Sequence, residues 1–262
     1  DAQGNVVAAS QGGVVHKLNP QGQLLWTHWL ANTIQASPCV GPDGSVYIGD
    51  TGGSFFGISP EGARKFKVSI GDAMRNACAV DLAGNVYVGG GDANLRKFSP
   101  NGTLILSKFL REKILSTPAV ADDGTVIASA FNNYTYVLSA GGGLMWYVPV
   151  SGSAATAHGR VYIQSAGGLH VYTAGGASVW SFGASASCGD PIIESPAVDI
   201  EGNVYFKHLG SGCNGGGTVY AVNPDGRLLW CASVPGGARS SPSLGRGRAL
   251  YIGSGTGLLI FG

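Results

Sequence analysis

Charged residues are scarce in this sequence, and their scarcity limits what the protein could attract. Only 12% of the 262 residues are Asp, Glu, Lys or Arg, against about 25% in an average domain, and the formal net charge is +1. The acidic and basic residues are also interspersed along the chain. We therefore expect no electrostatic attraction to nucleic acid or to an anionic membrane surface.

Long apolar runs and helical periodicity are missing as well. No run approaches the ~20 apolar residues of a membrane-spanning helix, so membrane insertion is not expected. No stretch keeps its apolar residues at the spacing of a helix face, which predicts minimal helix content. The sequence opens at Asp1 without a Met or a signal peptide, which suggests processing or a domain cut from a longer chain. Glycine, by contrast, occurs 44 times and indicates many turns.

What the sequence does contain is a repeat. A large apolar residue recurs at 40-residue intervals as Trp26, Phe66, Leu106 and Trp146, and again at other intervals as Trp180 and Trp230. Each follows a glycine-bearing turn such as "NPQG", "SPEG" or "NPDG". Seven further strand-like segments begin beside Val6, Val46, Val86, Val126, Val161, Val204 and Leu250. Each unit therefore indicates four short strands joined by Gly, Asp, Asn and Pro turns.

Units of this kind predict an all-β fold, a β-propeller of four-stranded antiparallel blades. In a propeller each sheet buries its faces only against neighbouring sheets, and the repeat is about 40–45 residues. A β-sandwich would not keep this register, and a β-solenoid uses shorter coils. Seven second and third strands but six first and fourth strands can be counted, which predicts seven blades. The alternative is part of an eight-bladed ring.

The whole chain is predicted to form one propeller domain. The expected blades span about 1–35, 36–75, 76–115, 116–150, 151–187, 188–236 and 237–262.

Several segments resemble a known repeat family. "SPAVDIEGNVYF", "TPAVADDGTVIAS" and "VYAVNPDGRLLW" are similar to the PQQ-like repeats of the quinoprotein alcohol dehydrogenase-like superfamily. That superfamily includes an eight-bladed outer-membrane assembly scaffold and non-enzymatic sensor domains. The resemblance implies that a fourth-strand Trp docks on the neighbouring blade, a structural role for Trp26, Trp146, Trp180 and Trp230. Phe66 and Leu106 depart from the pattern but keep the bulk.

The resemblance does not extend to redox chemistry. Redox members of the superfamily hold a quinone against two adjacent cysteines and bind calcium, whereas the five cysteines here stand apart and no calcium-type carboxylate cluster occurs. His16 and His170 fall at the same strand position of different blades, so they are not expected to share a metal. We therefore expect no cofactor, no metal site and no catalytic residue.

The cysteines indicate the compartment. Cys188 and Cys213 lie in the two insertions that break the repeat, in loops expected on the same face of one blade, and we predict a disulfide between them. Cys39 and Cys78 lie in inner strands of adjacent blades and are expected to be small buried residues, with a bridge not favoured. Cys231 is expected to be unpaired. An extracellular or periplasmic protein is therefore predicted. The sequons at Asn101 and Asn133 would carry glycans only in a secreted eukaryotic chain.

A candidate binding face follows from the loops. Loops from second to third strands and loops between blades should share one face, and this face collects most polar residues that turn geometry does not explain. Its candidate binding residues are Asp50, Asp72, Arg75, Asp92, Asn94, Arg111, Glu112, Asn132, Asp190 and His208, with Asp190 and His208 the most favoured.

The predicted function is that of a non-catalytic binding or scaffold propeller. The expected partner is a protein or a surface glycan, and the chain is expected to be part of a larger extracellular or periplasmic protein or assembly. The alternatives are a propeller enzyme with a small site, of the lyase or cyclotransferase type, and a degenerate quinoprotein. An enzyme would need titratable residues that converge over the central channel, and the inner strands supply mostly small residues.

Overall fold

The structure is a computed structural model that describes residues 1–114, 116–183, 195–208, 217–234, 240–245, 249–254 and 257–261. The chain divides into two compact units. Unit 1 holds Asp1–Asn132 and Tyr136–Leu144, and unit 2 holds Asn133–Thr135 and Met145–Gly262. All regular structure in the described residues is β, and no helix that could span a membrane is found among them.

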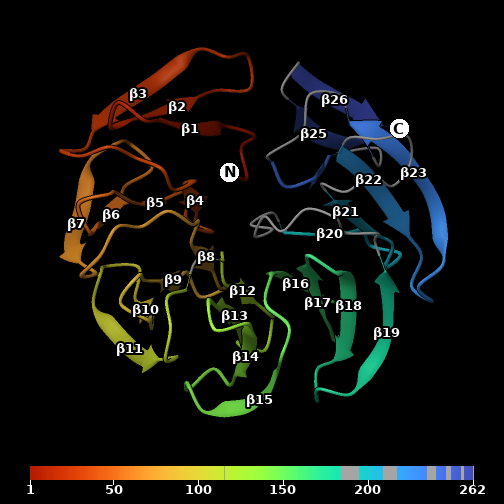
Figure 1. Cartoon of the computed structure of the whole chain (residues 1–262). Helices are drawn as coiled ribbons and strands as arrows, with labels where there is room; N and C mark the ends of the chain where they lie inside the picture. The colour runs from red at the N-terminus through yellow and green to blue at the C-terminus, as the bar shows by residue number, and fades with distance from the viewer. Residues whose placement is uncertain are drawn as a thin grey trace. The chain divides into compact units, whose positions relative to one another are not determined.

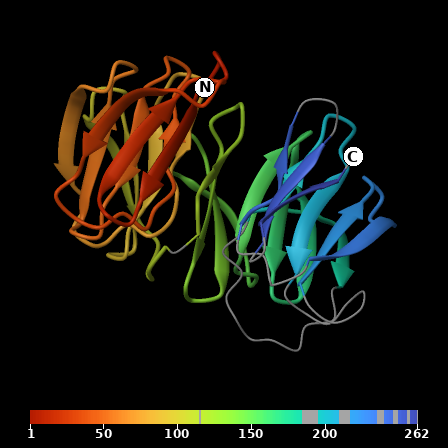
Figure 2. The same cartoon turned by 90° about the horizontal axis from the view of Figure 1, so that it is seen from above.

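Three sheets lie entirely within unit 1, and most of a fourth sheet also belongs to it (Figures 1 and 2). The boundary between the units falls within the fourth sheet, whose last strand is β15 (Leu144–Val148). The other strands, in chain order, are β1 (Val6–Ser10), β2 (Val14–Leu18), β3 (Leu24–Trp29), β4 (Cys39–Val40), β5 (Val46–Gly49), β6 (Ser54–Ile58), β7 (Arg64–Ser69), β8 (Ala79–Val80), β9 (Val86–Gly89), β10 (Asn94–Phe98), β11 (Leu104–Phe109), β12 (Ala119–Val120), β13 (Val126–Ala130) and β14 (Tyr134–Leu138).

Unit 2 contains three further sheets, each again built from strands that follow one another in the chain. Its strands are β16 (Ser153–Ala157), β17 (Arg160–Ser165), β18 (Gly168–Thr173), β19 (Ser178–Gly183), β20 (Ala197–Val198), β21 (Val204–His208), β22 (Gly217–Val222), β23 (Leu228–Val234), β24 (Ser243–Leu244), β25 (Leu250–Ser254) and β26 (Gly257–Phe261).

The strand inventory confirms the predicted fold class. Among the described residues, five sheets have four antiparallel strands, and two sheets, β1-β2-β3 and β24-β25-β26, have three. In this part of the chain the first sheet has no first strand and the last has no fourth, as the sequence predicts. First strands of neighbouring blades lie side by side, as β4, β8 and β12 do in unit 1 and β16 and β20 do in unit 2. The fold is a β-propeller with seven blades. That residues 1–262 form a single domain stays a prediction.

Two kinds of turn generate the repeat. Between third and fourth strands, a Ser, Thr or Asn side chain accepts the N–H of the residue four positions later. Asn19 accepts from Gln23 at 2.8 Å, for example. A glycine three positions after the acceptor has positive φ, which glycine adopts without steric cost. These glycines are Gly22, Gly62, Gly102, Gly142, Gly176 and Gly226.

The turn between first and second strands uses an aspartate. The Asp81 carboxylate accepts the backbone N–H of Asn85 at 2.8 Å, its side-chain amide at 2.9 Å and the Tyr87 hydroxyl at 3.1 Å. Asp199 makes the same three contacts with Asn203 and Tyr205. Burial opposes ionisation of both carboxyls, but these hydrogen bonds outweigh it and hold the pKa of each below its usual value.

The fourth-strand side chains contact the next blade. The Trp26 indole N–H donates to the Pro60 carbonyl oxygen at 2.8 Å, and Trp180 donates in the same way to Pro224. Trp146 donates to Ala174 at 2.8 Å. Phe66 packs against Gly102, and Leu106 packs against Gly142. Trp230 stacks on Phe261 with ring centroids 5.6 Å apart.

Three cysteine expectations need correction. Cys39 in β4 and Cys78 just before β8 form a disulfide, with Cα atoms 5.8 Å apart. The first strands of adjacent blades run side by side, and this brings together two residues that are 39 apart in sequence. Cys231 is also disulfide-bonded, not unpaired. Cys188 and Cys213 lie outside the described residues, but the predicted bridge between them is incompatible with a disulfide at Cys231, because Cys39 and Cys78 already pair and the chain holds only five cysteines.

Candidate functional site

In unit 1 the two kinds of loop share one face, because backbone hydrogen bonds join them. The N–H of Ile70, after a fourth strand, donates to Gly53 in a second-to-third strand loop at 2.9 Å. Leu110 donates to Ala93 in the same way at 2.9 Å. We call the face formed by residues 30–38, 50–53, 70–78, 90–94, 110–114 and 131–132 the loop surface of unit 1.

Three of the predicted binding residues hold the loops together. The Asp50 side chain is buried, and its carboxylate accepts the N–H groups of Gly52 and Ser54 and the side-chain amide of Asn32, at 2.9–3.0 Å. Asp50 therefore stabilises a turn, and its carboxylate is not available to a binding partner.

Asp92 and Asn94 form a second such network. Asp92 pairs with Arg96 and accepts the Asn94 N–H at 3.2 Å. Burial disfavours the charged form of Asp92, but the hydrogen bonds from Arg96 and Asn94 prevail and hold the pKa of the carboxyl below its usual value. Asp92 thus stays ionised as the anchor of its loop.

Other predicted residues lie on the surface. Asp72, Arg75, Arg111 and Glu112 are exposed. The Arg75 guanidinium donates to the Gln35 side-chain oxygen at 2.9 Å, which fixes it along the surface. No hydrogen bond or ion pair to another residue of the described ranges engages the side chains of Arg111 and Glu112.

The remaining predicted residues are less accessible. Asn132 is half-buried and its amide donates to the Tyr136 hydroxyl at 2.9 Å. His208, in unit 2, has only 4% of its surface exposed, and its ring Nε2 lies 2.9 Å from the Ala166 carbonyl oxygen. The structure therefore places His208 in the interior, not on a binding loop. Asp190 lies outside the described residues.

Exposed aromatic side chains are the feature that sequence analysis missed. Trp29 is 72% exposed, Phe109 62% and Phe131 61%. Trp29 and Phe109 each precede a buried residue, Leu30 and Leu110, at the end of a fourth strand. Since side chains alternate along a strand, a residue next to that buried position points to solvent. This alternation in the sequence could have revealed the exposed positions of Trp29 and Phe109.

Phe131 lies against the segment that follows Phe109. The Phe131 N–H donates to the Lys113 carbonyl oxygen at 2.9 Å, and Ile114 bridges Ala130, so the loop after β13 lies against the segment that follows Phe109. We define the aromatic–basic patch as Phe109, Arg111, Glu112, Lys113 and Phe131, all exposed. It combines two large rings, two cations and one anion on hydrogen-bonded backbone.

Residues that could ligate a metal ion are not clustered in the described ranges. No group of three or more His, Cys, Asp and Glu residues there could hold a metal ion. His16 bonds Thr27 and His170 bonds Ser165, each within its own blade. Burial lowers the pKa of His170.

The blades and their turns define a propeller of the PQQ-like repeat class. The chain belongs to the family described as outer membrane protein assembly factor BamB, which matches residues 11–260. No curated protein matches the sequence at a significant level.

Two solved structures share the fold. BamB from Moraxella catarrhalis has a TM-score of 0.67 and 14% sequence identity, covering 98% of this chain and 92% of that one. The computationally designed Ika8 protein has a TM-score of 0.80 and 15% identity, covering 98% and 80%. At these identities the likeness concerns the fold alone.

Proposed function

We propose that this propeller is a non-catalytic scaffold that binds a protein partner during assembly of outer membrane proteins. The observation that carries the proposal is the family match, which spans residues 11–260 and is described by an assembly factor of that kind. The rigid blades fix the positions of the loops, and the loops would contact the partner protein.

The aromatic–basic patch is the proposed contact surface. Aromatic residues and Arg are enriched at protein interfaces, and truncating them often causes the largest losses of binding energy. Phe109 and Phe131 offer large apolar area at low cost in side-chain entropy, while Arg111 is uncommitted within the described residues. An acidic or mixed surface with an apolar centre would complement this patch.

A non-catalytic role fits the state of the carboxylates. Several hydrogen bonds hold each of four carboxylates in a turn, so these groups stabilise the fold. The four are Asp50, Asp81, Asp92 and Asp199. General acid or base catalysis needs a group that can exchange a proton near the working pH, and lowered carboxyl pKa values point away from that role.

An oxidising compartment is part of the proposal. The Cys39–Cys78 disulfide would be rare in a reducing cytosol. Together with the family's description, it supports a periplasmic location facing the outer membrane.

Site-specific photo-crosslinking tests the proposed surface. A photoreactive residue at position 109 or 131 should crosslink one defined protein in cells of the source, identified by mass spectrometry. Position 105 on the same strand β11 is the control, since Ile105 is also exposed but lies away from the loop surface. A partner crosslinked from position 105 and not from 109 or 131 would reject the patch. Crosslinks from none of the three positions would count against the scaffold function itself.

A further inference from the structure

Arg111 lies in one of three matching loops that follow fourth strands in unit 1. Each loop has three residues between two buried apolar side chains, and the loops span residues 31–33, 71–73 and 111–113. At the start of the third loop, the Leu110 N–H donates to the Ala93 carbonyl oxygen at 2.9 Å. At its end, the Ile114 N–H donates to the Gly90 carbonyl oxygen at 3.1 Å. The backbone is therefore held on both sides of Arg111.

The backbone conformation of Arg111 is one that favours glycine. Its φ is 73°, in the left-handed region, and Gly71 at the same position of the previous loop has a φ of 84°. A residue with a Cβ is strained in this region, because the Cβ approaches a carbonyl oxygen, whereas glycine is not. Strained residues of this kind cluster at functional sites. Glycine would suit the fold better at position 111, so the backbone does not explain the arginine.

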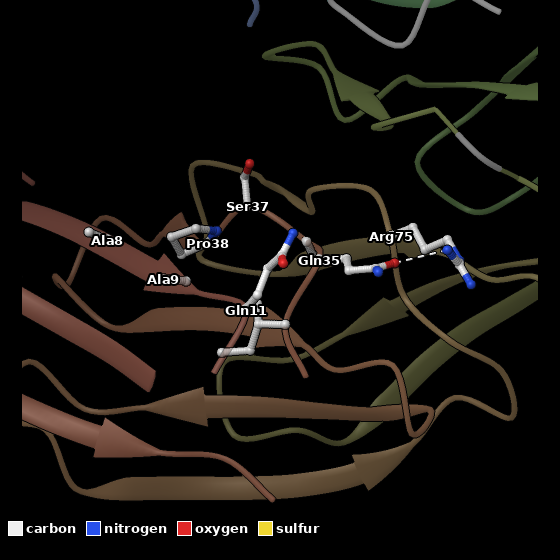
Figure 3. Close-up of a pocket in the computed structure, with 9 residues that line it drawn as sticks. Ala8, Ala9, Gln11, Gln35, Ser37, Pro38 and Arg75 are labelled. Carbon is white, nitrogen blue, oxygen red and sulfur yellow. Dashed lines mark hydrogen bonds between the residues drawn. The ribbon is translucent and has the colours of Figure 1, made fainter. Parts of the chain in front are cut away.

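The fold makes no use of the Arg111 side chain within the described residues. No hydrogen bond or ion pair engages its guanidinium there, and the Asp92 carboxylate of the adjoining loop is already paired with Arg96. Arg75, another exposed arginine of the loop surface, differs in this respect. It lines a pocket in unit 1 and donates to the Gln35 side-chain oxygen at 2.9 Å (Figure 3). The Arg111 guanidinium is thus exposed and uncommitted in the described part of the chain.

The rest of the third loop also differs from the loop before it. In the second loop, the Asp72 side chain packs over Gly91 in the second-to-third strand loop of the following blade. Forty residues later, Glu112 stands at the position of Asp72 and Phe131 at the position of Gly91. Both are exposed, and no hydrogen bond or ion pair engages Glu112 within the described residues. The third loop therefore presents its side chains to solvent beside an exposed ring.

We propose that Arg111 determines the specificity of the aromatic–basic patch by binding a carboxylate of the partner protein, from an Asp or Glu side chain with apolar neighbours. The inference rests on the proposed scaffold function, because it names the group on the partner that the patch recognises. A guanidinium matches a carboxylate with two parallel hydrogen bonds. Phe109 and Phe131 offer apolar surface to the residues beside that carboxylate.

The charges of the loop favour a carboxylate over a phosphate group. Glu112 follows Arg111 directly and Lys113 follows Glu112, so the three charged side chains sum to one positive charge. A phosphate group carries a charge of about −1.5 to −2 at neutral pH, and the neighbouring Glu112 would repel it more strongly than it repels a singly charged carboxylate.

Stability measurements test whether the arginine is kept at the expense of the fold. Arg111→Gly removes the Cβ together with the guanidinium, whereas Arg111→Ala keeps the Cβ and removes the guanidinium. In urea unfolding, the equilibrium constant of unfolding should be about threefold lower for Arg111→Gly than for Arg111→Ala or the wild type, because the strain at positive φ is relieved. A glycine variant that is no more stable than the wild type would show that the fold itself needs Arg111 and would overturn the proposal.

Photo-crosslinking in cells of the source tests the carboxylate. The probe is a photoreactive phenylalanine at position 131. Arg111→Gly and Arg111→Ala should each lower the yield of crosslinked partner by about tenfold or more, as expected when hydrogen bonds to a charged group are lost. Arg64→Ala, which removes an exposed arginine from β7, is the matched control and should keep the yield. Arg111→Glu should also lose the crosslink, and replacing an Asp or Glu in the crosslinked stretch of the partner with Arg should restore it.

The outcomes separate this inference from the scaffold function. If the wild-type patch crosslinks no protein, the scaffold function is rejected and this inference with it. Equal yields from the wild type and both Arg111 variants, or no rescue by the reversed charges, would overturn the role of Arg111 and leave the scaffold function intact. Sedimentation with phosphatidylglycerol vesicles that is lost in Arg111→Gly would assign the residue to a membrane surface and reject the protein carboxylate.

Discussion

The indole N–H of Trp26 donates to the carbonyl oxygen of Pro60, 34 residues later, at 2.8 Å. The ring lies over Gly62 of the same turn, where an added Cβ would come within 2.8 Å of the indole. Trp180 repeats the arrangement with Pro224 and Gly226. The large fourth-strand side chain of one blade thus packs on the turn glycine of the next blade, and this contact joins successive blades.

Gly62 should tolerate alanine less well than Gly22. Both have positive φ, 91° and 78°, but an added Cβ at Gly22 meets nothing within 4 Å. Gly22→Ala should lower the free energy of unfolding by about 1–2 kcal/mol from backbone strain alone. Gly62→Ala should cost about 1–3 kcal/mol more, because the Trp26 ring must move. Urea unfolding of the two variants measures the difference, and equal costs would mean that the ring contact is loose.

Removal of the Trp26 side chain should destabilise the blade contact. Trp26→Ala should lower the free energy of unfolding by about 3 kcal/mol, near the lower end for large aromatic truncations because the ring is only half-buried. Trp29→Ala is the matched control three residues away, and at 72% exposure it should change stability by less than about 0.5 kcal/mol. Thermal or urea unfolding distinguishes the two, and similar losses would refute the docking role.

The Cys39–Cys78 disulfide should stabilise the pair of inner strands. A closed loop of this length is worth about 3–4 kcal/mol in the chain-entropy estimate, so Cys39→Ala/Cys78→Ala should lower the free energy of unfolding by that order.

Non-reducing peptide mapping checks the pairing directly. It should recover Cys39 linked to Cys78, and it would also show whether Cys231 is linked to Cys188 or to Cys213. Recovery of Cys39 and Cys78 as alkylated thiols from unreduced protein would contradict the disulfide.

Acid should remove the contribution of the Asp199 turn. The folded-state pKa of Asp199 is lowered from 3.8. Its stabilisation is therefore fully present above about pH 4 and is lost as the pH falls through the lower folded value. Asp199→Asn should be less stable than the wild type at pH 7, and the difference should shrink towards pH 2.

Urea midpoints measured from pH 7 to pH 2 test this. Asp225→Asn, in an exposed turn, is the control and should remain within about 0.5 kcal/mol of the wild type at pH 7. A difference between wild type and Asp199→Asn that grows as the pH falls would have the wrong sign.

The candidate site was only partly predictable. The sequence placed the two kinds of loop on one face, and in unit 1 the hydrogen bonds from Ile70 and Leu110 join them as expected. It did not distinguish Arg111, which is uncommitted on the surface of the described part, from Asp50, which is buried in a turn. Both are polar loop residues, and their difference depends on which backbone amides lie within reach.

By itself, the sequence determined the period, the number of strands and the position of every turn just described. Those features depend on local physics: glycine at positive φ, side chains that cap turns, and apolar residues that alternate along strands. The tertiary structure decided that Cys39 meets Cys78, that His208 lies inside and that Phe131 lies against the segment that follows Phe109. Each of these depends on how strands or loops distant in sequence lie side by side, and a repeat pattern fixes that neighbourhood only after the blades have packed.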